Sequence, residues 1–186
     1  MRAVLISIQP KWCELIASGK KTVEVRKTAP KLEPPFKVYI YCTKKKKQDE
    51  YGSIIFYKDP NGICVDNGEG CFPLLTGMVI GEFVCDKIFD IYIEISKPDD
   101  LPGYPFPCTG LTDKEILQYL GNGKTGYGWH ISDLVIYDDP KPLTDFTIRE
   151  CIWHNINGCI DASGERCYDC RLKRPPQSWR YVEELI

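Results

Sequence analysis

Short runs of alternating apolar and polar residues recur along this chain, and turn-forming residues separate them. Such alternation is typical of β-strands. Fourteen prolines and fifteen glycines supply the turns between them. The predicted strands are residues 2–8, 22–26, 36–42, 53–57, 63–65, 78–86, 88–95 and 127–137. We expect 53–57 and 63–65 to pair as a hairpin, because Asp59-Pro60-Asn61-Gly62 between them is a strong turn signal.

Helical spacing is confined to two short segments. The first, 10–18, has Pro10 where a helix tolerates proline and Gly19 where a helix commonly ends. The second starts at Thr112, which with Glu115 forms a capping-box pattern. With so few helices there is no βαβ repeat, so we expect a mostly β fold with short helices, of the α+β class, built on a mostly antiparallel sheet or a small barrel.

Length and composition are those of a globular protein. The 186 residues are 43% hydrophobic and 27% charged, which is enough for one domain with an appendage. No apolar run approaches the ~18 residues of a membrane helix, and no signal-peptide pattern follows the first strand. We therefore expect a cytoplasmic protein with no membrane partner. Ten cysteines fall below the ~8–10% of a disulfide scaffold, so we expect mostly reduced thiols.

The charges are unevenly distributed. The net charge is −2, yet residues 1–50 hold 12 Lys and Arg against 5 Asp and Glu, and the remainder holds 12 against 21. A basic first third on an acidic body indicates a local anion site rather than a surface that coats nucleic acid.

The densest group of charged residues follows the first predicted helix. Gly19 is followed by Lys20 and Lys21, and the next strand carries Glu24 and Arg26 on one face. Two cations, Lys21 and Arg26, and one carboxylate then lie within reach of one patch, which could hold a phosphate. The alternative interpretation is a solvated strand face with an ordinary surface ion pair.

Residues 10–26 resemble the hallmark segment of ASCH domains, members of the PUA-like superfamily. The family signature is Gly-x-Lys-x-x-x-x-Arg, commonly with Glu two residues before the Arg, and Gly19, Lys21, Glu24 and Arg26 match it. Looser similarity, extending over about residues 1–143, includes 79–83, 127–131 and 140–143. With 174–179 near its end, the whole chain is similar to ASCH proteins carried by phages and prophages.

The resemblance implies a PUA-like β-barrel over residues 1–143. The composition then becomes Cys-rich, so we expect residues 144–186 to be an extension packed on the barrel. The resemblance also implies a cleft beside the helix–strand junction that binds RNA or a nucleotide. The rival function is a hydrolase with Lys21 and Glu24 as catalytic residues, either an amidohydrolase acting on a modified nucleoside or a ribonuclease. In the amidohydrolases of the family a Thr nucleophile occupies the position of Glu24. A third alternative is a phage accessory protein that binds an unidentified host protein.

Three residues of the last predicted strand could extend the binding site. Tyr127 and Trp129 could stack on an unpaired base, although Trp129 shares its face with Ile131 and so fits the core as well. His130 lies on the opposite face, as a binding residue or as an ordinary surface histidine. Glu82 interrupts an apolar strand face and is either an inward acidic partner of Lys21 or Arg26 or an edge residue.

The last part of the chain carries a possible metal-ligand pattern. Cys167 and Cys170 form a C-x2-C knuckle that could hold a structural zinc ion with Cys159 and Cys151, with His154 as a substitute ligand. The alternative is that these thiols pack a small extension. No other cofactor is expected.

Overall fold

A computed structural model of the chain describes residues 1–44, 63–66, 71–74, 76–93, 107–148 and 170–185. Its elements in chain order are β1 (Arg2–Ile8), α1 (Pro10–Ala17), β2 (Val23–Arg26), β3 (Phe36–Cys42), β4 (Ile63–Asp66), β5 (Cys71–Leu74), β6 (Val79–Cys85), β7 (Ile88–Ile93), the 3₁₀ helix η2 (Pro107–Thr109), α2 (Asp113–Leu120), β8 (Lys124–His130), β9 (Ser132–Lys141), the 3₁₀ helix η3 (Leu143–Asp145) and β10 (Trp179–Glu183).

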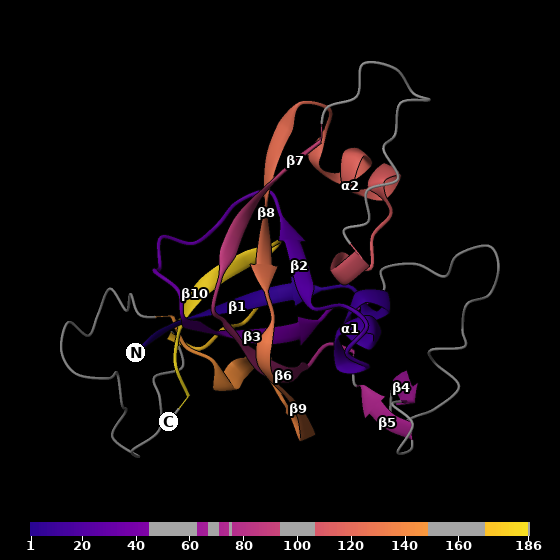
Figure 1. Ribbon diagram of the computed structural model, residues 1–186. Helices are drawn as coiled ribbons and strands as arrows, with labels where there is room; N and C mark the ends of the chain where they lie inside the picture. Colours follow the sequence, from indigo (N-terminus) through magenta and orange to yellow (C-terminus); the bar gives the residue numbers. More distant parts are fainter. Residues whose placement is uncertain (45–62, 67–70, 75, 94–106, 149–169, 186) are drawn as a thin grey trace, which may run out of the picture.

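The strands form two larger sheets and one ribbon. The main sheet has the order β10-β1-β3-β6-β9, in which β1 and β3 are parallel and the other neighbours are antiparallel. The second sheet has the order β2-β8-β7 and is antiparallel, and β4 pairs with β5. Figure 1 shows the second sheet crossing the strands of the main sheet.

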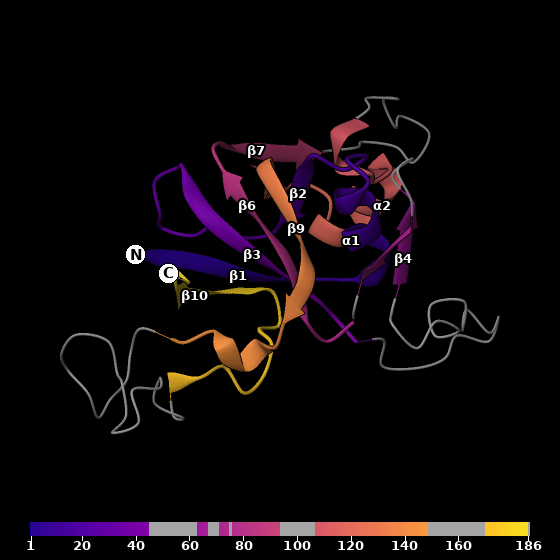
Figure 2. The same ribbon diagram turned by 90° about the horizontal axis from the view of Figure 1, so that it is seen from below.

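The principal core lies between the two sheets and α1. It contains the inward residues of β1, the buried face of α1 and, from the second sheet, Trp129. On its other face the main sheet packs against Phe146 and Leu172, from segments that lie opposite α1 (Figure 2). Every residue of β1 after Arg2 is buried, as in a strand covered on both faces.

Helix α2 covers the outer face of the second sheet. Ile116 and Leu120 of α2 pack against Val25 and Ile91 from the strands. The predicted capping box is confirmed: Thr112 Oγ1 accepts a hydrogen bond from the Glu115 backbone N–H at 3.2 Å, and Glu115 Oε2 accepts one from the Thr112 backbone N–H at 2.9 Å.

The predicted strand 127–137 is wrong as a single strand. The chain leaves the second sheet after His130 and enters the main sheet at Ser132. At the corner, the Ile131 N–H donates to the Thr22 carbonyl at 2.8 Å, and Asp133 has a φ of 47°. The buried face changes at the corner: Trp129 and Ile131 are buried before it, whereas after it Leu134 and Ile136 pack against the core and Val135 is 50% exposed.

The predicted hairpin of 53–57 with 63–65 is not tested, and one further strand lies outside the predicted set. The strand at 63–66 pairs with 71–74 across 67–70, whereas the expected partner 53–57 lies outside the described residues. The C-terminal strand β10 was not predicted, yet it pairs with β1 along five residues, from Arg2 with Glu183 to Ile6 with Trp179.

The fold is mostly β, with two α-helices in the described part of the chain, as the sequence predicts. The described strands do not close into a single barrel, because no strand of the second sheet pairs with a strand of the main sheet there. Neither of the described helices has the length and apolar character needed to cross a membrane.

Candidate functional site

The junction of α1 and β2 is built by a glycine turn. Gly19 has a φ of 71°, a left-handed conformation that an L-residue adopts only at a cost. Its N–H donates to the Ile16 carbonyl, and the Lys21 N–H donates to the Leu15 carbonyl, both at 2.9 Å. The chain therefore turns immediately after the helix and places Lys21 two residues before β2.

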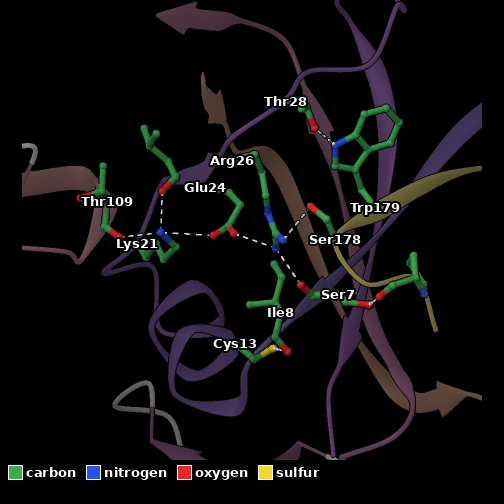
Figure 3. A network of polar contacts seen from close by, with 12 residues as sticks. Ser7, Ile8, Cys13, Lys21, Glu24, Arg26, Thr28, Thr109, Ser178 and Trp179 are labelled. Atoms are coloured by element: carbon green, nitrogen blue, oxygen red, sulfur yellow. Dashed lines mark hydrogen bonds and ion pairs between the residues drawn. The ribbon is translucent and has the colours of Figure 1, made fainter. Parts of the chain in front are cut away.

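Lys21, Glu24 and Arg26 converge in the interior, and we call them the triad. Their exposed fractions are 2%, 6% and 7%. Glu24 joins the two cations: its Oε2 lies 3.2 Å from Lys21 Nζ, and its Oε1 lies 2.9 Å from Arg26 Nη2. Figure 3 shows these side chains in one continuous line of contacts. The predicted proximity of the three residues is therefore observed, but in the protein interior rather than on a solvated strand face.

Backbone carbonyls complete the coordination of both cations. Lys21 Nζ donates to the Val23 carbonyl at 2.8 Å and to the Thr109 carbonyl at 2.5 Å. Arg26 Nη2 donates to the Ser7 carbonyl at 2.7 Å, and Arg26 Nη1 donates to Ser178 Oγ at 3.4 Å. The triad thus links β2 to η2, to the end of β1 and to the residue before β10 (Figure 3).

Burial affects the ionisation of the triad side chains. Burial lowers the pKa of Lys21, and the neighbouring Glu24 carboxylate opposes that shift. Three acceptors surround Lys21 Nζ, and a neutral amine has only two hydrogens to donate, so the contacts fit the ammonium form. With all three groups ionised, two cations and one carboxylate carry a net charge of +1 inside the protein.

The other predicted binding residues lie around the triad without joining it. Lys20 is exposed, and Tyr127 is half-buried against the core. Trp129 is fully buried, with its ring 6.0 Å from Phe36 in an edge-to-face contact, so its faces are occupied by protein. His130 is partly exposed, and its Nδ1 lies 2.6 Å from Asp86 Oδ1. That hydrogen bond lowers the pKa of Asp86.

Glu82 is a partner of neither Lys21 nor Arg26 among its described contacts. Its Oε1 lies 3.0 Å from Lys37 Nζ, and its Oε2 accepts a hydrogen bond from the Tyr137 hydroxyl at 2.5 Å. Glu82 is directly opposite Tyr39, whose side chain packs with the second core on the far side of the main sheet. The hypothesis of an inward acidic partner for the triad is therefore wrong.

The contacts that sequence reasoning missed are mostly backbone atoms. The Ser7 and Thr109 carbonyls bind the cations, and every residue has such a carbonyl, so no sequence signal identifies them. Ser178 contributes its hydroxyl and lies within the segment 174–179 that carried the resemblance, which was the only available signal.

The predicted zinc ligands lie almost entirely outside the described residues. Cys151, His154, Cys159 and Cys167 belong to the undescribed segment, and Cys170 is buried. Within the described ranges, no group of three or more potential metal ligands occurs. The zinc site stays a prediction.

Comparison with known proteins finds a family match that spans the junction of α1 and β2. Residues 6–94 match the family model of the ASCH domain. Among solved structures, the chain is similar to that of ASCH from Zymomonas mobilis, with 18% identity and a TM-score of 0.55, over 98% of this chain and 88% of that chain.

Two further similar structures are a tyrosine-to-phenylalanine mutant and a serine-to-alanine mutant of the Zymomonas mobilis protein. Each has 17% identity and a TM-score of 0.55 over 98% of this chain, and the matches cover 91% and 89% of those chains. At these identities the likeness shows a shared fold. No curated protein matches this chain.

Proposed function

We propose that this chain, whose residues 6–94 match the ASCH domain model, binds RNA or a nucleotide at the junction of α1 and β2. The family match supports nucleic-acid binding in general, by analogy with the family. The triad supports the particular place, because Lys21, Glu24 and Arg26 are the residues that match the ASCH signature and they meet in one network.

The observation that carries this proposal is that two buried basic side chains share a single carboxylate. An isolated buried charge is costly, since the protein interior solvates it poorly. Glu24 neutralises one of the two cations and leaves the other uncompensated within the described part of the chain. A phosphate oxygen brought next to Arg26 would supply the missing negative charge, and a guanidinium is well suited to bind it.

Binding at the triad requires one protein contact to give way. The contact between Arg26 Nη1 and Ser178 Oγ is the longest in the network, at 3.4 Å, and it joins a charged donor to a neutral acceptor. An anionic oxygen makes a stronger charge-assisted bond. We therefore propose that the ligand replaces the Ser178 hydroxyl at Arg26, while Lys21 and Glu24 stay in place and fix the guanidinium.

The proposal is tested by measuring the affinity for uridine 5′-monophosphate and for a single-stranded RNA oligonucleotide. We expect Arg26→Met and Lys21→Met to weaken binding of both ligands about tenfold or more, which corresponds to about 1.4 kcal/mol. The matched control is Lys37→Met, which removes an ion-paired lysine that lies outside the triad. Circular dichroism identifies the folded variants.

Unchanged affinity in folded Arg26→Met would contradict the proposal. Glu24→Gln is an informative second variant, because it raises the net charge of the triad without removing a cation. We expect it to bind the nucleotide at least as tightly as the wild type, even if it is less stable.

A second candidate function is favoured by one observation, the lowered pKa of Lys21. A lysine with a lowered pKa is a better proton acceptor near neutral pH, and Glu24 is close enough to exchange a proton with it. The corresponding activity is hydrolysis of acetylated cytidine or of RNA. Turnover of either substrate by the wild type that is lost in Lys21→Met would support a hydrolase function. Absence of turnover in the wild type would contradict it.

A further inference from the structure

Two buried hydrogen-bond donors beside the triad have no acceptor among the described residues. They are Arg26 Nε and Trp129 Nε1. Arg26 is 7% exposed and Trp129 is 0% exposed, so bulk water does not reach either nitrogen. Buried donors in folded proteins are nearly always bonded, which makes two such donors in neighbouring residues a feature that needs an explanation.

The two donors belong to adjacent strands and to the same face of the second sheet. Glu24 is directly opposite Trp129, and Arg26 is directly opposite Tyr127. Arg26 and Trp129 are therefore diagonal neighbours, a separation that long side chains span. The face they share turns toward the principal core, where Trp129 lies.

The nearby protein acceptors are already engaged. Both carboxylate oxygens of Glu24 lie against cations, and the Ser7 carbonyl accepts from Arg26 Nη2. The Ser178 hydroxyl contacts Arg26 Nη1 rather than Nε. Among the described residues no acceptor is left for Nε and the indole N–H, and a bound molecule can supply one.

Residues at the start of β10 cover this position. Ser178 lies against Arg26, and the ring of Trp179 lies 5.9 Å from the ring of Trp129. Trp179 is held from outside by a bond from its Nε1 to Thr28 Oγ1 at 3.0 Å, which is solvent-exposed. Displacement of Ser178 by a ligand would therefore open the side of Arg26 that leads toward Trp129.

We propose that Arg26 Nε and Trp129 Nε1 donate together to one phosphoryl oxygen of the bound ligand. This inference rests on the proposed function and adds to it a second, uncharged donor. Arg26 supplies the charge that attracts the phosphate, and the indole N–H of Trp129 selects an acceptor atom without adding charge. Trp129 thus acts through its ring nitrogen rather than through stacking of a base on its buried faces.

The rival explanation is a buried water molecule that accepts from both donors whether or not ligand is present. Such waters are common at buried polar groups. Nuclear magnetic resonance of the ¹⁵N-labelled full chain separates the two, because both N–H groups give their own signals. Arg26→Lys and Trp129→Phe assign those signals, and the indole signal of Trp179, already bonded to Thr28, serves as the internal control.

The probes are inorganic phosphate, uridine 5′-monophosphate and uridine, each titrated separately. We expect the Arg26 Nε–H and Trp129 indole N–H signals to move downfield together with the phosphate-bearing probes, with one dissociation constant for each probe, and to stay fixed with uridine. The Trp179 indole signal should move less.

Three results would overturn the inference. The first is binding of the nucleotide, seen at other signals, while the two donor signals stay fixed. The second is a persistent cross-peak from both donors to a long-lived water with ligand bound. The third is an equal response to uridine. All three results are compatible with nucleotide binding at the junction. If no signal responds to the nucleotide, both the inference and the proposed function are wrong.

Discussion

Lys21 is the residue in which burial and ion pairing oppose each other most directly. Its side chain is 1% exposed, and its ammonium group bonds two backbone carbonyls and the Glu24 carboxylate. Burial is the largest influence on its pKa and lowers it, while Glu24 acts in the other direction. The fold therefore holds a charged group that the interior disfavours, and the contacts around Nζ offset that cost.

Because burial has the larger effect on the pKa of Lys21, the free energy of unfolding should depend on pH. A lysine in the unfolded chain has a pKa of about 10.4, and burial lowers the pKa of Lys21 in the fold. Between the two values the unfolded chain binds more protons, so the contribution of Lys21 to the free energy of unfolding rises with pH. It is complete above about pH 10.4 and is lost as pH falls through the folded pKa.

Denaturant unfolding at several pH values measures this contribution as the difference between the wild type and Lys21→Met. Other titrating groups are common to both proteins and cancel. We expect the difference to increase toward alkaline pH. A difference that decreases would mean that the ion pair with Glu24, rather than burial, controls the ionisation of Lys21.

At the scale of elements, the site depends on the turn that connects α1 to β2. The turn at Gly19 sets the distance between the last helical residue and Lys21, and the second sheet then fixes the register of Glu24 and Arg26. A Cβ at Gly19 would meet no heavy atom within 4 Å. Its left-handed backbone is therefore the only local reason for glycine at this position.

Substitutions at Gly19 test that reason. Gly19→Ala should lower the free energy of unfolding by about 1–2 kcal/mol, the cost of a left-handed conformation for an L-residue. Gly19→Asn should cost less, because asparagine tolerates this region better. Chemical denaturation of both variants measures the order. Equal losses would show that something other than backbone conformation requires glycine.

The same elements show what a sequence predicts well. Local signals were reliable: Pro10 and Gly19 bracket α1, and Thr112 with Glu115 starts α2. The corner at Ile131 was missed, because the apolar residues Trp129, Ile131 and Val135 alternate in the sequence as one strand would, although the structure exposes Val135 after the corner. Alternation in a sequence does not show where one strand ends and the next begins.

At the scale of the whole molecule, the triad is a meeting point of distant segments. Ser7, Thr109 and Ser178 contact it from the two ends and the middle of the chain. The sequence predicted that Lys21, Glu24 and Arg26 share a patch, because they are close along the chain. It could not predict the burial, since the covering contacts are long-range and two of them are backbone carbonyls.

Burial changes how the site would work. A solvated patch attracts phosphate weakly and is screened by salt, whereas a buried cation with incomplete compensation binds an anion strongly once its cover is displaced. The expected RNA or nucleotide ligand therefore interacts with few phosphates at close range. The C-terminal strand takes part in this arrangement, because it pairs with β1 and carries the covering Ser178 and Trp179 alongside.

The most direct test of this account is the salt dependence of affinity for a single-stranded RNA oligonucleotide, compared between the wild type and Arg26→Met. Each phosphate contact to a single strand contributes about 0.7 to the slope of log affinity against log salt concentration. We predict that Arg26→Met binds more weakly and that its slope is shallower by about that amount, while Lys37→Met keeps the slope of the wild type. A folded Arg26→Met with the affinity and slope of the wild type would show that the triad does not bind phosphate.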